Sequence, residues 1–162
     1  MFKTRLLSGI VLVIILIATV GCGGEVLFGV LGIISLIGMT ELYKVVGVQK
    51  KPIAFAGYLA AVAYYALLYT NQLNRLPLLI MGFMIVLMAV YVFSYPAFVA
   101  DQVATVFFGV FYVAMMMSYV YQTRMLEDGG IVVWLIFLSS WGCDTCAYCT
   151  GMLIGKHKMA PV

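Results

Sequence analysis

Charged side chains are scarce in this sequence. Only 9% of its 162 residues are Asp, Glu, Lys or Arg, whereas 65% are apolar. A soluble domain typically carries about 25% charged residues, which supply its polar surface. Nine basic and six acidic side chains cannot cover a soluble fold of this length. This scarcity excludes an ordinary soluble domain, and a lipid bilayer is the solvent that accepts so apolar an exterior.

The sequence also lacks a basic stripe for nucleic acid and the pattern of a disulfide framework. The net charge is only +3, and no basic stripe runs beside exposed aromatics, so we expect no nucleic-acid partner. Only four cysteines are present, in a chain unlike the short secreted proteins that disulfides stabilise. Cys143, Cys146 and Cys149 resemble part of an iron–sulfur spacing, but no suitably spaced fourth ligand follows. We interpret these three as small packing residues.

Long apolar runs dominate the sequence. Six segments approach the roughly 20 residues needed to cross the hydrocarbon core of a bilayer. They cover residues 6–22, 26–46, 53–70, 76–95, 103–121 and 131–154. We predict an all-α polytopic membrane bundle of about six transmembrane helices, with sequential helices as antiparallel neighbours. Pro77 suits the first turn of the fourth helix, and Asp101 is placed to cap the fifth.

The positions of Lys and Arg predict the orientation. With a cytoplasmic N-terminus, the cytoplasmic set is Lys3, Arg5, Lys44, Lys50, Lys51, Lys156 and Lys158. Only Arg75 and Arg124 then lie on the other side. We therefore expect both termini in the cytoplasm. Among the acids, Glu41, Asp101 and Asp144 fall on or toward that same side.

The N-terminus allows a second interpretation. Lys3 and Arg5 before an apolar run are typical of a signal peptide, and 19–22 (T-V-G-C) faintly resembles a lipoprotein cleavage site. The apolar run is longer than a usual signal core, and five further segments follow it. We favour a first transmembrane helix.

Asp144 is the only charged residue in the last apolar segment. A carboxylate inside a membrane span costs roughly 3 kcal/mol on insertion scales, so it needs a cation, a metal or a water-filled cavity. Tyr148, Gly151 and Gly155 share its helix face at i+4, i+7 and i+11. Ala147, Gly151 and Gly155 form two small-xxx-small steps that favour close helix packing. We expect this face to be buried in a bundle and lined with polar groups.

A structural interpretation of these residues stays open. Asp144 could simply pair with a neighbouring cation. Lys156 and Lys158 could bind phosphate as point charges at the membrane surface, or they could anchor the helix end on the cytoplasmic side. Glu41 and Lys44, spaced i, i+3, are expected to form an ordinary ion pair.

The stretch from Trp141 to Val162 resembles the phosphatidate cytidylyltransferase family, whose members read close to W-x-x-D-T-x-A-Y-x-x-G-x-x-x-G-K-H-K-x-x-P. The matching residues are Trp141, Asp144, Thr145, Ala147, Tyr148, Gly151, Gly155, Lys156, His157, Lys158 and Pro161. Lys3-Thr4-Arg5 and Glu41-Leu42-Tyr43 are also similar to that family. Cys146 departs from the usual glycine, and Cys143 from a small residue such as Ser or Ala.

The resemblance implies an enzyme that converts CTP and phosphatidate into CDP-diacylglycerol and diphosphate, with Mg²⁺ as cofactor. It implies a catalytic, metal-binding role for Asp144 and substrate binding by Tyr148, Lys156 and Lys158. It also implies a bacterial inner or plasma membrane protein in contact with membrane lipid. Homodimerisation is left open. We treat residues 1–162 as one transmembrane domain.

Further elements that the family usually carries do not follow the match. An S-P-K-K-[ST]-x-E-G segment, more helices and a C-terminal signature are expected beyond Pro161, but the sequence ends at Val162. We therefore expect an N-terminal fragment that is inactive alone, since Asp144 is its one strong carboxylate candidate. Two alternatives are a small transporter or channel with Asp144 as its coupling residue, and a related CTP-dependent lipid or polyprenol kinase.

Overall fold

The structure is a computed structural model that describes residues 2–154, with side chains described for residues 11–153. The chain divides into two compact units, residues 1–121 and residues 122–162. Each unit is described by itself below. That the whole chain forms one domain stays a prediction.

The part of the chain that the structure describes is helical and contains no strand. Its elements are α1 (Phe2–Cys22), α2 (Gly24–Val45), α3 (Pro52–Tyr69), the 3₁₀ turn η1 (Leu73–Arg75), α4 (Leu76–Phe93), α5 (Ala100–Gly109), the π-helical segment η2 (Val110–Met115), α6 (Met116–Arg124) and α7 (Gly129–Ile154). Because α5, η2 and α6 follow one another without a break, they form one continuous helical segment of 25 residues.

These elements correspond to the six predicted segments, with ends that shift by a few residues. Within residues 2–154, five helices are long and apolar enough to cross a membrane, and the described part of α1 adds a shorter apolar helix, Val11–Cys22. Many of their large apolar side chains are exposed, as lipid-facing positions require. The protein is an all-α, multi-pass membrane bundle, as predicted.

Helix ends test two local predictions. Pro77 lies in the first turn of α4, as predicted. The prediction for Asp101 is wrong, because α5 begins one turn earlier than expected and Val99 is its N-cap. The Gln102 side chain accepts a hydrogen bond from the Val99 backbone N–H at 3.3 Å. Asp101 instead lies in the first turn, where its negative charge interacts favourably with the positive end of the helix dipole.

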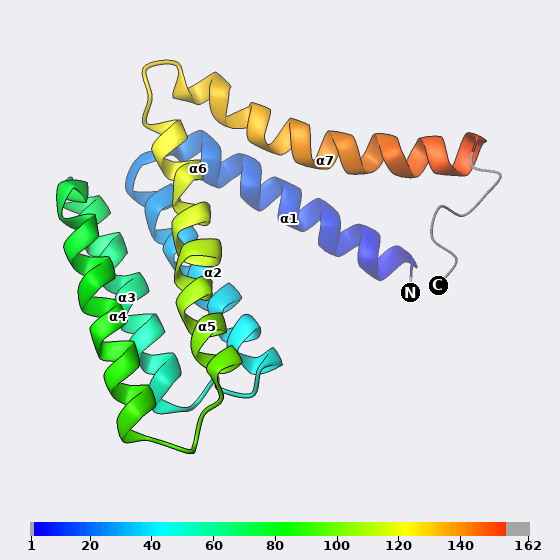
Figure 1. Cartoon of the computed structure of the whole chain (residues 1–162). Helices are drawn as coiled ribbons and strands as arrows, with labels where there is room; N and C mark the ends of the chain where they lie inside the picture. The colour runs from blue at the N-terminus through cyan, green and yellow to red at the C-terminus, as the bar shows by residue number, and fades with distance from the viewer. Residues whose placement is uncertain (1, 155–162) are drawn as a thin grey trace. The chain divides into compact units, whose positions relative to one another are not determined.

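α1 and α2 contact each other and run in roughly opposite directions, as predicted for sequential helices (Figure 1). Gly23 and Gly24, between these helices, both adopt positive φ, 63° and 49°. Glycine is suited to this left-handed backbone because it lacks a Cβ. Beyond this turn α2 packs with α3, α4 and α5, which Figure 1 shows side by side.

Tyr43 is the central packing residue of the first unit. Its side chain is fully buried, and its hydroxyl donates a hydrogen bond to the Val106 carbonyl oxygen at 2.9 Å. A Cβ added at Gly57 of α3 would overlap the Tyr43 hydroxyl, and one added at Gly109 would lie 2.8 Å from the ring. Because Gly57 and Gly109 have no side chains, they leave a slot for the Tyr43 ring. The ring in this slot packs α2 against α3 and α5.

Buried hydroxyls surround the π-helical segment Val110–Met115. Tyr64 Oη lies 2.6 Å from Ser118 Oγ, which in turn donates to a carbonyl oxygen of the segment at 2.7 Å. Tyr65 Oη lies 2.7 Å from Ser35 Oγ and 3.4 Å from another of these carbonyl oxygens. A π-helical turn shifts the regular backbone hydrogen bonds, and such turns are frequent at functional sites. Here the hydroxyls connect the segment to α2 and α3.

Candidate functional site

The predicted site residues lie on α7, in the second unit. This helix is continuous from Gly129 to Ile154, with no break at Gly142. The i, i+4 and i+7 spacing of Asp144, Tyr148 and Gly151 therefore places them on one face of a regular helix. The structure confirms this geometric part of the site prediction.

Little else in the second unit covers that face. Asp144 is exposed, Tyr148 is 67% exposed, and a Cβ added at Gly151 would meet nothing within 4 Å. Among the described residues, Asp144 has no hydrogen-bond or ion-pair partner. Within this unit the face is open, with a carboxylate and a phenol on the same side. Its burial in a bundle stays a prediction.

The basic part of the predicted site follows the end of α7. Gly155, Lys156 and Lys158 lie outside the described residues, so their predicted roles in packing and in substrate binding stay predictions. Ala147 lies on α7 and is exposed within the second unit, as is Gly151. The close helix packing predicted from these small residues therefore also stays a prediction.

The Asp144 carboxylate is compatible with a magnesium ion that also binds substrate phosphates. Within residues 2–154, no three His, Cys, Asp or Glu side chains cluster closely enough to hold a metal ion. Mg²⁺ is commonly bound by one or two carboxylates together with substrate phosphates and water. A single open carboxylate such as Asp144 fits that mode. An iron–sulfur site is a poor fit, because Cys143, Cys146 and Cys149 are separate free thiols on exposed helix positions.

The second stretch that resembled the family has a structural role in the first unit. Glu41 and Lys44 form the predicted i, i+3 ion pair, with 3.6 Å between carboxylate and ammonium, and both side chains are largely exposed. Such an exposed pair contributes little to stability. Tyr43 between them fills the slot described above. Sequence reasoning did not assign it a role, although two glycines on later helices were a signal of close approach.

Comparison with known proteins gives a consistent result. The cytidylyltransferase family model matches residues 3–162. Proteins named phosphatidate cytidylyltransferase match from Staphylococcus saprophyticus (28% identical), Staphylococcus haemolyticus (29%) and Staphylococcus epidermidis (27%). Each match covers 99% of this chain and 62% of the relative.

The chain thus spans about three fifths of the length of these curated relatives. No solved structure matches it. The family match nevertheless extends over nearly every residue of the chain, from the first apolar helix to the motif around Asp144. This chain belongs to the cytidylyltransferase family.

Proposed function

We propose that the complete protein carrying this chain is a membrane phosphatidate cytidylyltransferase. Its reaction joins CTP and phosphatidate into CDP-diacylglycerol and diphosphate. The observation that carries the proposal is the family match over residues 3–162, together with the names of the staphylococcal relatives. The apolar helices of the described residues support it, because phosphatidate is a lipid and must be reached within a bilayer.

The proposed chemistry gives the open face of α7 a role. A phosphate oxygen of phosphatidate attacks the α-phosphorus of CTP, and the bond to the diphosphate leaving group breaks. Mg²⁺ bound with the nucleotide would neutralise charge on the phosphates. The Asp144 carboxylate would hold that ion from the protein side. Tyr148, one helical turn further on, is positioned to orient a substrate phosphate by donating a hydrogen bond.

Lys156 and Lys158 are proposed to bind substrate phosphates as point charges near the membrane surface. Their positive charge would also reduce the repulsion between phosphatidate and CTP, which are both anionic. By the positive-inside pattern this end of α7 faces the cytoplasm, where CTP is available. We place the protein in the bacterial inner or plasma membrane and leave homodimerisation as a further proposal.

An assay of labelled CTP tests this function. Membranes that contain the complete protein are expected to convert labelled CTP and added phosphatidate into labelled CDP-diacylglycerol. Membranes that contain residues 1–162 alone are expected to give only background, because one carboxylate and the two lysines are too few to bind and activate both substrates. Lipid labelling that does not depend on phosphatidate would contradict the proposal. Full turnover by residues 1–162 would contradict the expected need for further residues.

A further inference from the structure

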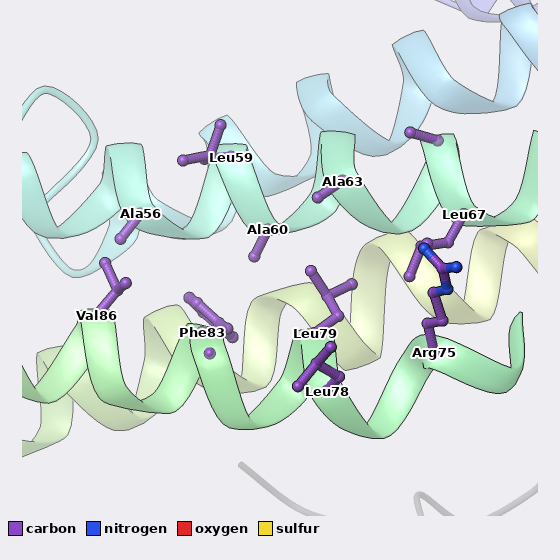
Figure 2. Close-up of a pocket in the computed structure, with 12 residues that line it drawn as sticks. Ala56, Leu59, Ala60, Ala63, Leu67, Arg75, Leu78, Leu79, Phe83 and Val86 are labelled. Carbon is purple, nitrogen blue, oxygen red and sulfur yellow. The ribbon is translucent and has the colours of Figure 1, made fainter. Parts of the chain in front are cut away.

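An apolar groove runs along α3 and α4, which pack against each other in the first unit. Its volume is about 560 Å³, within the range of pockets that hold small molecules. Figure 2 shows alanines of α3 facing leucine, phenylalanine and valine side chains of α4. The groove is deep where its lining residues are small, at Ala60, Ala63 and Gly82. Large apolar side chains line it at Leu78 and Val86. The groove therefore offers a long apolar surface.

Arg75 is the one charged residue that lines this groove, and it lies at the end where α4 begins. Figure 2 shows its guanidinium extending toward Leu67 of α3. The side chain is exposed, and it forms no ion pair with any of the residues that the structure describes. An unpaired guanidinium beside an apolar groove is complementary to a ligand with an anionic head and an apolar tail. Phosphate is the anion that its planar fork of donors matches well.

The length of the groove agrees with a lipid. On α3 its lining runs from Ala56 to Leu67, twelve residues with a rise of about 16 Å along the helix. One leaflet of a bilayer contributes about 15 Å of hydrocarbon. A groove of this length that starts at Arg75 is therefore about as long as one leaflet is thick.

We propose that the α3–α4 groove binds one anionic phospholipid, with an acyl chain lying along the groove and the lipid phosphate on Arg75. This site is separate from the proposed phosphatidate site, because the positive-inside pattern places Arg75 on the non-cytoplasmic side of the membrane. Its occupant comes from the leaflet on that side and stabilises the α3–α4 pair. The site follows from the membrane fold alone and does not depend on the proposed reaction.

Native mass spectrometry of the purified complete protein tests this site. The probe is an equimolar mixture of phosphatidylglycerol and phosphatidylcholine. One phosphatidylglycerol is expected to be retained in preference to phosphatidylcholine. Arg75→Gln is expected to weaken that retention about ten-fold, as loss of one charge-assisted contact with phosphate predicts.

Two glycine variants supply a matched pair. A Cβ at either Gly82 or Gly29 would meet nothing within 4 Å, so the first carbon of a leucine side chain is accommodated at both positions. Gly82→Leu fills the groove and is expected to abolish retention of the lipid, whereas Gly29→Leu on α2 should leave it unchanged. Equal retention by the native protein, Arg75→Gln and Gly82→Leu would overturn the proposal. So would efficient disulfide dimers of Gly82→Cys, which would assign the groove to a second copy.

Discussion

Replacing Asp144 by Asn in the complete protein is expected to reduce CDP-diacylglycerol synthesis on the order of 100-fold or more. The substitution keeps the size and the hydrogen-bonding capacity of the side chain but removes the negative charge. If the carboxylate holds a metal ion against the phosphates of CTP, this charge is the property that matters. Labelled CTP incorporation by membranes at saturating phosphatidate measures the effect.

Asp128→Asn is the matched control for that experiment. Asp128 precedes α7, and its backbone carbonyl accepts hydrogen bonds from Ile131 and Val132 at the start of the helix. Asn is as good as Asp at a helix start, so the control makes the same chemical change without loss of the helix end. It should retain activity within a factor of about two. Activity near normal in Asp144→Asn would remove Asp144 from the site.

The second large effect is expected in the Tyr43 slot. Gly57→Ala would place a methyl group against the Tyr43 hydroxyl and 3.1 Å from a methyl carbon of Val106. The ring is fully buried and its hydroxyl is hydrogen-bonded, so it cannot move aside easily. Overpacking of this kind typically costs about 1–3 kcal/mol. The free energy of unfolding of the purified chain, measured by titration of its detergent micelles with SDS, should fall by that amount.

A double variant identifies the cause. Tyr43→Phe removes the hydroxyl that the new methyl group meets, although it also loses a hydrogen bond worth about 0.6 kcal/mol in membrane proteins. Combined with Gly57→Ala it should therefore destabilise less than the sum of the two single variants, by about 1 kcal/mol. Gly29→Ala is the control and should be neutral or stabilising, since its Cβ meets nothing. If the effects of the two single variants on stability simply add, contact between the new methyl group and the Tyr43 hydroxyl is not the cause of the destabilisation.

The sequence predicts the spans of this fold well, for a physical reason. A bilayer requires about 20 apolar residues in each helix, so composition alone locates all six segments to within a few residues. Helix ends depend on finer chemistry. Asp101 was predicted to cap α5, but Gln102 supplies the side-chain hydrogen bond at that end. Either residue type could satisfy the free N–H groups, and spacing alone did not distinguish them.

Contacts between helices were less predictable than the helices themselves. The Tyr43 slot needs glycines on α3 and α5, which only the packed bundle brings together. The groove beside Arg75 depends in the same way on facing small residues of α3 and α4. Alanines at 56, 60 and 63 share a helix face, but such a stripe is equally typical of close helix packing. The sequence does not state whether that face meets another helix or a lipid.

The candidate site was located by its motif rather than by its environment. The spacing of Asp144, Tyr148 and Gly151 predicted a shared face, and the unbroken α7 confirms it. The partners of that face could not be predicted, since the cavity proposed around Asp144 needs groups from other helices and this chain spans 62% of its relatives. Which other carboxylates would lie near Asp144 depends on how the helices pack, and the sequence of one segment does not show that packing.

Binding of Mn²⁺ in place of Mg²⁺ to the purified complete protein, followed by electron paramagnetic resonance with and without CTP, tests the central claim most directly. The claim is that the Asp144 carboxylate holds the metal ion that accompanies the nucleotide. We predict CTP-dependent binding of Mn²⁺ that Asp144→Asn weakens by at least about ten-fold and that Asp128→Asn leaves intact. Equal Mn²⁺ affinity in the native protein and in Asp144→Asn would contradict the account.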